Sequence, residues 1–139
     1  MNEPDYAALL RFRTTLRRFQ QWSEQQAAAA GLTAGQHQLL LAVRGHEDPR
    51  GPTIGDLADY LLVRHHSAVE LVGRTESAGY VQRERDAEDG RMVRVRLTSR
   101  GAETIRGLAE AHQTELRTLE AMLRSLSDLG DLGDESVPG

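Results

Sequence analysis

The sequence predicts a mainly α-helical fold with one small β-hairpin, in which a helix-turn-helix is followed by a wing. Two helical patterns are separated only by Leu62 and Val63, and so short a connection is typical of a helix-turn-helix. Two strand-like stretches follow, residues 80–85 and 92–97, joined by a charged loop. The parts expected within a single domain, 1–139, are a winged helix-turn-helix lobe at 33–98, dimerisation helices at 5–30 and 99–129, and a disordered tail at 130–139.

Length and composition set the class of protein. The 139 residues are 39% hydrophobic and 27% charged, which is ordinary for a single globular domain. The absence of cysteine excludes disulfides and thiolate metal sites. No apolar run is long enough to span a bilayer, and the N-terminus lacks the order of a signal peptide. We therefore expect a cytoplasmic protein that does not enter a membrane.

The net charge of −4 argues against a nonspecific polyanion binder, which is normally strongly basic. All 17 basic residues are arginine. That usage fits either a preference for bidentate contacts to phosphates and bases or a genome rich in arginine codons. Any contact with DNA must then depend on where a few arginines lie, because the bulk charge does not favour it.

The first predicted helix, residues 5–30, has an apolar seam suited to packing against another long helix or another subunit. Pro4 precedes the seam and Gly31 follows it, as expected at helix ends. The seam residues fall at spacings of three and four: Leu9, Phe12, Leu16 and Phe19. The charged face is either a solvated surface or a nucleic-acid contact, and it contains Arg11, Arg13, Arg17 and Arg18.

Threonine caps mark the starts of the next two helices. Thr33 is followed three residues later by Gln36, which is the pattern of a capping box. Thr53 precedes a helix whose apolar residues are at inward spacing. The proline- and glycine-rich segment between these helices, residues 46–52, is predicted to lack regular structure. The second helix of the helix-turn-helix spans about residues 64–77, and Gly79 ends it.

The wing and the last helix complete the chain. Val93, Val95 and Leu97 alternate with arginines, so the second strand has one apolar and one charged face. Thr98 is the expected cap of the last helix. Apolar residues repeat along that helix over more than three heptads, which indicates a helical partner.

A helix-turn-helix lays its second helix in the major groove of DNA, where outward residues meet base edges. Arginine there can donate two hydrogen bonds to guanine. Glu70 either accepts from cytosine or, four residues before Arg74, holds that side chain in place, and the second role is favoured. The outward residues are Arg64, His65, His66, Ser67, Glu70 and Arg74.

The charged hairpin loop is the second expected contact. Arg91 near its tip can enter an adjacent minor groove, and Asp89 can orient the guanidinium. Three further arginines are expected to contact backbone phosphates: Arg83, Arg94 and Arg96. The alternative is a solvated, salt-bridged hairpin, because the wing's acidic residues roughly balance its arginines, and spacing alone does not decide between the two.

Three motifs resemble the MarR family of bacterial transcriptional regulators: LTAGQ at 32–36, ESAGYVQR at 76–83, and DGR at 89–91 followed by LTSRG at 97–101. The resemblance implies a homodimer held by the first and last helices on a pseudo-palindromic operator in double-stranded DNA. It makes Asp89 and Arg91 the wing pair and residues 64–74 the reading helix. It also implies release from DNA when a small aromatic ligand binds between the dimerisation helices and the DNA-binding lobe. Leu62, where the family often has glycine, and Thr75, where it usually has an apolar residue, depart from the pattern.

The histidines allow other interpretations. His66 and Glu70 have the spacing of half a metal site, but no second cluster lies nearby in sequence, so we expect DNA contact and no metal. His112 falls on the apolar seam of the last helix. It is either a buried, hydrogen-bonded core residue or part of a ligand pocket with Trp22 and His37.

The expected function is that of a homodimeric, DNA-binding transcriptional repressor without a cofactor. The alternative is a winged-helix module that binds an acidic protein partner through its arginine-rich face. No catalytic motif is present: the sequence has no cysteine nucleophile, no G-x-S-x-G, no phosphate-binding glycine loop and no HExxH. We therefore do not expect an enzyme.

Overall fold

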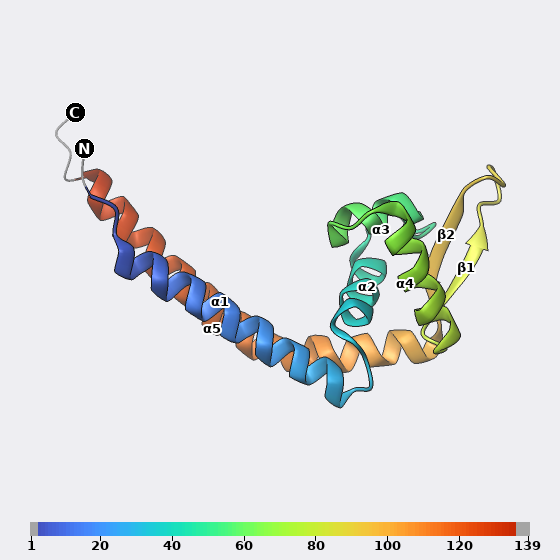
Figure 1. The fold of residues 1–139 in the computed structure, drawn as a ribbon, viewed down its shortest axis with the longest axis horizontal. Coiled ribbons are helices and arrows are strands. Elements are labelled where there is room, and N and C mark those ends of the chain that lie inside the picture. Colours follow the sequence, from blue (N-terminus) through green and yellow to red (C-terminus); the bar gives the residue numbers. More distant parts are fainter. Residues whose placement is uncertain (1–2, 136–139) are drawn as a thin grey trace. The chain divides into compact units, whose positions relative to one another are not determined.

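A computed structural model describes residues 3–135, with side chains through residue 125, and it confirms the mainly helical fold with one hairpin. The chain forms two compact units. The helical unit comprises the residues through Gln25 and those from Glu110 on, and the winged unit comprises Gln26–Ala109. The elements are α1 (Tyr6–Ala29), α2 (Ala34–Gly45), α3 (Ile54–Leu61), α4 (His65–Ser77), β1 (Val81–Arg85), β2 (Val93–Leu97) and α5 (Ser99–Glu135) (Figure 1).

The helical unit consists of most of α1 and the second part of α5. The carboxylate of Asp5 accepts a hydrogen bond of 3.0 Å from the backbone N–H of Ala8, and α1 begins there. Helix α5 continues to Glu135, so the prediction of a disordered tail from residue 130 is wrong for residues 130–135. Its glycines weaken a helix without ending it, and the first proline of this region is Pro138. The remainder of the predicted tail lies outside the described residues.

Both predicted threonine caps are confirmed. The hydroxyl of Thr33 accepts from the N–H of Gln36 at 3.1 Å, and the Gln36 side chain accepts from the N–H of Thr33 at 3.0 Å. Thr53 and Asp56 form the same reciprocal box at the start of α3, at 3.1 and 2.9 Å. Each box satisfies two backbone donors that a helix start otherwise leaves unpaired.

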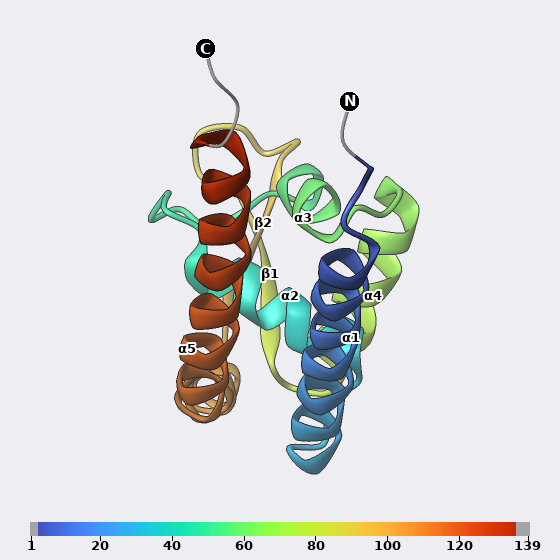
Figure 2. The same ribbon diagram turned by 90° about the vertical axis from the view of Figure 1, so that its left-hand side faces the viewer.

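The core of the winged unit is aliphatic. Helices α2, α3 and α4 pack against one another, and the hairpin lies beside α4 (Figures 1 and 2). Each of these elements contributes side chains that exclude water, which accounts for the apolar periodicities in the sequence. The completely buried aliphatic residues include Leu39, Leu40, Leu57, Val72 and Val95.

The turn between α3 and α4 has an unusual backbone. Leu62 adopts a left-handed conformation, with φ 56° and ψ 44°, and its side chain is 91% exposed. The N–H of Val63 donates to the carbonyl of Ala58 at 3.1 Å and closes the turn. A left-handed backbone favours glycine because it crowds a Cβ. Leu62 therefore occupies a strained position without burying its side chain.

The wing is an antiparallel hairpin in which Val81 lies opposite Leu97 and Arg85 lies opposite Val93. The segment before α3 adds to it: Thr53 forms a bridge with Arg94, and the carbonyl of Pro52 accepts from the N–H of Val95 at 2.9 Å. Residues 46–52 contain no helix or strand, as predicted, and the bridge forms at Thr53, immediately after them. A proline cannot donate to a strand, but its carbonyl can still accept.

The end of α4, the start of β1 and the start of α5 are fastened together, an arrangement that we call the clamp (residues 78–80 and 98–101). The hydroxyl of Thr98 donates to the carbonyl of Gly79 at 2.7 Å and accepts from the N–H of Gly101 at 3.1 Å, which confirms Thr98 as the cap of α5. Arg100 lies over the ring of Tyr80, 4.4 Å from its centroid. A Cβ on Gly101 would overlap the carbonyl oxygen of Tyr80. The clamp thus has no room for a side chain at that position.

Candidate nucleic-acid interface

Helix α4 presents one polar face to solvent. Its opposite side is buried through Ala68, Val72 and Thr75, which fixes the orientation of the helix in the winged unit. The predicted outward residues are all on the accessible side. Arg64, at the N-cap, and His65, His66, Glu70 and Arg74 are exposed, and Ser67 is half-buried.

The outward side chains of α4 make no hydrogen bond or ion pair within the described part of the chain. In particular, no ion pair joins Glu70 to Arg74 there, so the predicted pairing of these two residues is absent. Arg64 likewise makes no side-chain capping bond at the start of the helix. Every donor and acceptor on this face is therefore available to an external partner.

Thr75, one of the two departures from the family pattern, is accommodated without an unpaired polar group. Its side chain is completely buried, and its hydroxyl donates to the carbonyl of Leu71 at 2.7 Å. A hydroxyl bonded to its own helix in this way does not need a partner from the core. The inner face of α4 therefore stays packed.

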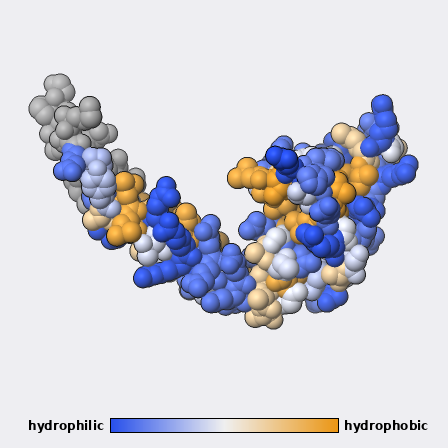
Figure 3. Space-filling model, viewed as in Figure 1, coloured by the Kyte–Doolittle hydropathy of each residue, from blue (hydrophilic) through white to orange (hydrophobic). Residues whose placement is uncertain are grey.

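The tip of the wing carries a guanidinium that is almost fully solvated. Arg91 has a side chain that is 95% exposed, and its Nε lies 3.4 Å from the Oδ1 of Asp89. The same oxygen accepts from the backbone N–H of Arg91 at 3.1 Å. This is the arrangement predicted for the pair, and it leaves most of the guanidinium donors unused. The surface around the tip is hydrophilic (Figure 3).

Arg94 was expected to contact phosphate, and the structure corrects that expectation. Its side chain is buried, its Nε is 2.8 Å from the Oδ2 of Asp86, and its Nη1 donates to the carbonyl of Gly51 at 3.0 Å. The backbone N–H groups of Glu88 and Asp89, followed by Arg94, hold the pKa of Asp86 below its usual value. Arg94 therefore joins the wing to the segment before α3 and is not accessible to DNA.

Arg83 and Arg96 are accessible but engaged. Arg83 makes two side-chain contacts with Glu76, with its Nε at 3.0 Å and its Nη2 at 2.9 Å. The backbone N–H of Arg83, ahead of its side chain, lowers the pKa of Glu76. Arg96 lies 3.1 Å from Glu84 and donates to the carbonyl of Pro49 at 3.1 Å. The salt-bridged alternative therefore describes this part of the wing.

Arg85 is a further accessible cation that the sequence patterns did not indicate. It ends β1, it is exposed, and no hydrogen bond or ion pair engages its side chain among the described residues. Arg83 and Arg85 lie two residues apart on the same strand, and only the structure shows that Glu76 pairs with Arg83. Among the wing arginines, Arg85 therefore keeps all of its side-chain donors available, and Arg91 keeps most of them while its Nε contacts Asp89.

Two of the three residues of the predicted ligand pocket, Trp22 and His112, lie together in the helical unit. His112 is 8% exposed, its Nε2 lies 2.7 Å from the hydroxyl oxygen of Ser23, and its ring meets Trp22 edge to face at 4.7 Å. This is the buried, hydrogen-bonded histidine that was one of the two expectations. His37 is also buried, but it belongs to the winged unit. A pocket that includes all three residues remains a prediction.

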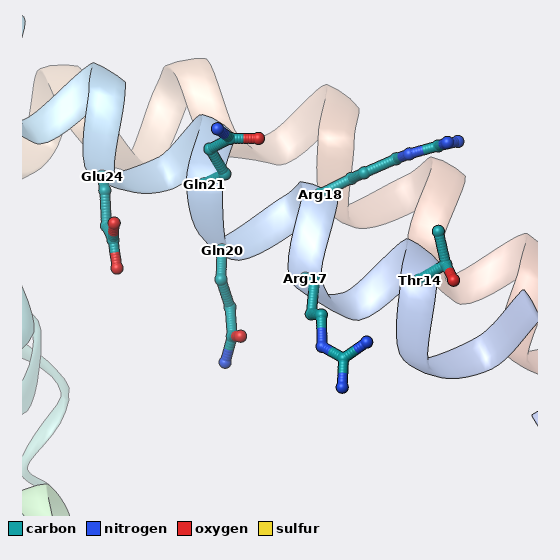
Figure 4. A pocket seen from close by; sticks show the side chains of 6 residues that line it. All are labelled: Thr14, Arg17, Arg18, Gln20, Gln21 and Glu24. Atoms are coloured by element: carbon teal, nitrogen blue, oxygen red, sulfur yellow. The ribbon is translucent and has the colours of Figure 1, made fainter. Parts of the chain in front are cut away.

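The arginine-rich face of α1 is not one concentrated cationic site. An open hollow runs along it, and its lining includes Arg17, Arg18 and Glu24. Figure 4 shows that Arg17 extends to one side of the helix, together with Gln20 and Glu24, and Arg18 extends to the other. Divided in this way, the arginines resemble a solvated face.

Within residues 3–135, no group of three or more potential metal ligands from His, Cys, Asp and Glu is close enough to hold an ion. In the same range, no helix combines the length and the apolar character needed to cross a bilayer.

Comparison with known proteins confirms the resemblance that the motifs indicate. The MarR family model matches residues 30–92, which cover α2, α3, α4 and most of the wing. The transcriptional activatory protein BadR of Rhodopseudomonas palustris is 35% identical over 82 residues, which are 59% of this chain and 47% of BadR. The chain thus spans about half the length of that relative.

Solved structures share the fold over nearly the whole chain. MepR of Staphylococcus aureus, a regulator of the multidrug efflux pump MepA, has a TM-score of 0.75 at 20% identity, covering 95% of this chain and 98% of its own. A MepR–DNA complex from S. aureus has a TM-score of 0.66 at 23% identity, covering 96% and 94%. Ligand-free MarR from E. coli has a TM-score of 0.69 at 20% identity, covering 99% and 100%.

Proposed function

We propose that this chain is a homodimeric transcription regulator that reads a pseudo-palindromic operator in double-stranded DNA. Helix α4 enters the major groove, and Arg91 at the wing tip enters the adjacent minor groove. The observation that carries the proposal is the uncommitted polar face of α4, because its side chains have no partners in the described chain. The relative BadR and the DNA-bound MepR structure support the same activity.

The dimer is supported by apolar side chains left exposed on the two long helices. Tyr6, Leu9 and Leu10 on α1 are 65%, 54% and 64% exposed. On α5, Leu116, Met122 and Leu123 are 49%, 37% and 41% exposed. A second copy of the chain would remove this surface from water. Two-fold symmetry then places the two reading helices about one turn of DNA apart, roughly 34 Å, which matches an inverted repeat.

The experiment is a selection of binding sites from random duplexes, followed by affinity measurements on the enriched site. We expect an inverted repeat and a dimer in sedimentation. Arg74→Ala and Arg91→Ala should each weaken binding about tenfold or more, because each removes a charged donor to DNA. Arg124→Ala is the matched control, since it removes an arginine that is already paired with Glu120 on α5. Unchanged affinity in both test variants, or no enriched repeat, would refute the proposal.

We propose repression as the direction of control, although BadR is named an activatory protein. A reporter with the selected operator placed across the promoter tests this directly. Repression requires less transcript when the regulator is present. More transcript from the same promoter would establish activation.

We further propose that a small aromatic ligand releases the regulator from DNA. Trp22 and His112, whose rings meet edge to face, supply an aromatic surface beside a polar hydroxyl, that of Ser23. A ligand that binds the DNA-free arrangement better will shift the population toward it. Thermal-shift screening of aromatic acids, followed by DNA-binding assays, should find compounds that stabilise the protein and release the operator. If a compound still stabilises the Trp22→Ala variant and still releases it from the operator, the ligand binds at a site other than the one beside Trp22.

A further inference from the structure

Gly73 lies on the outward side of α4, where it is half-buried. Gly73 comes four residues after Val69 and seven residues after His66, and these spacings place residues on the same side of a helix. The side chain of Val69 is 38% exposed. Glu70 and Ser77 border Gly73 three residues before and four residues after, and both are exposed. The reading face therefore has one position without a side chain, and exposed polar residues border it.

Nothing inside the protein requires this glycine. A Cβ built on Gly73 meets no atom within 4 Å, and its φ is not positive. On Gly101 a Cβ would overlap the carbonyl oxygen of Tyr80, and on Gly35 it would touch the side chain of Leu71 at 3.5 Å. A glycine inside a helix is less favourable than alanine, because it loses more backbone freedom on folding. Gly73 thus weakens α4 without any compensating contact in the described chain.

We propose that Gly73 is the point of closest approach between α4 and DNA, where a missing side chain lets the base edges reach the helix backbone. This inference rests on the proposed function and adds a specificity-determining residue to it. Glycine often marks places where another backbone or a ligand comes close. The polar residues around Gly73 would contact the bases and phosphates on either side. The local loss of helix stability is then offset only in the DNA complex.

The proposal predicts an uncommon combination, greater stability with weaker binding. Gly73→Ala should raise Tm by a few degrees, because alanine favours the helix and fills only open space. The same variant should weaken binding to the selected operator about tenfold, because one lost base contact is worth about that much. Gly73→Gln, with a longer side chain, should weaken it further while the protein stays folded.

Gly107→Ala is the matched control. Gly107 lies inside α5, and a Cβ there also meets nothing within 4 Å. This variant should raise Tm by a similar amount and leave operator affinity unchanged. Each protein is measured by thermal unfolding, by sedimentation and by fluorescence anisotropy with a labelled operator.

The outcomes separate this inference from the proposed function. One outcome would overturn only the role of Gly73. In that outcome the wild type binds the operator, Arg74→Ala weakens binding, and neither Gly73→Ala nor Gly73→Gln changes it. Failure of the wild type to bind any selected duplex would remove both proposals. An equal loss of affinity in the Gly107 control would also overturn the inference, since the effect would then come from helix stability.

Discussion

Asp86 and Arg94 form an ion pair that is nearly closed to solvent, with Nε and Oδ2 2.8 Å apart and side chains 9% exposed for Arg94 and 6% for Asp86. Removing either partner leaves the other charge in a place that water scarcely reaches. We expect Arg94→Ala and Asp86→Ala each to lower Tm by several degrees. The double variant should lose less than the sum of the two, because it leaves no isolated charge. Additive losses in thermal unfolding would contradict this coupling.

The wing arginines should differ in how they affect the salt dependence of DNA binding. Each phosphate or groove contact by an arginine releases counterions, so its loss reduces the slope of log affinity against log salt by about one. Arg91→Ala should show that reduction, because its guanidinium is 95% exposed. Arg96→Ala should show much less, because its side chain is held by Glu84 and the carbonyl of Pro49. Equal reductions in titrations at several salt concentrations would contradict the assignment.

Leu62→Gly should stabilise the protein. The left-handed conformation of Leu62, with φ 56°, crowds its Cβ, and its 91% exposed side chain gains nothing from packing. Relief of that strain should exceed the extra freedom that glycine has in the unfolded chain, by about 1 kcal/mol of unfolding free energy. Urea unfolding measures this change. Val63→Gly is the control, because Val63 has no positive φ and should lose stability on substitution.

Acid should weaken the attachment of the wing to α4. The backbone N–H of Arg83, followed by its side chain, lowers the pKa of Glu76 from its ordinary 4.5. A carboxylate whose pKa is lower in the folded state contributes stability at pH values above its ordinary pKa. That contribution is lost as the pH falls below about 4.5 and through the lowered folded-state pKa. In unfolding measurements between pH 6 and pH 3, Glu76→Gln should therefore show a shallower acid dependence than the wild type. Identical slopes would show that Glu76 does not contribute.

Local patterns in the sequence predicted the local parts of the fold. Thr33 with Gln36 and Gly79 after α4 each depend on residues a few positions apart, and both are confirmed. The alternation predicted for β2 holds for Val95 and Arg96 but fails at Arg94, which is buried. The position of Asp89 beside Arg91 is likewise a contact between near neighbours in sequence.

Errors arose where distant segments meet. Arg94 was placed on the DNA side because nothing in β2 shows that the carbonyl of Gly51 would accept from its guanidinium. His46 also meets a distant residue, since its Nδ1 lies 3.0 Å from the hydroxyl oxygen of Tyr60, a contact that its neighbours in sequence do not indicate. The absent pairing of Glu70 with Arg74 is a different case, because correct helical spacing permits an exposed ion pair but does not require one.

The base and the tip of the hairpin differ in how they are attached to the rest of the winged unit. The base is fastened by the hydrogen bonds of Thr98 to Gly79 and Gly101, whereas the tip projects without any cover from the rest of the winged unit. The segment before α3 holds the hairpin again farther along, where Val95 donates to the carbonyl of Pro52 and Arg94 donates to the carbonyl of Gly51. Among the described residues, no hydrogen bond from outside the hairpin reaches Arg91. The guanidinium at the tip therefore lies beyond the part of the wing that the core of the winged unit positions.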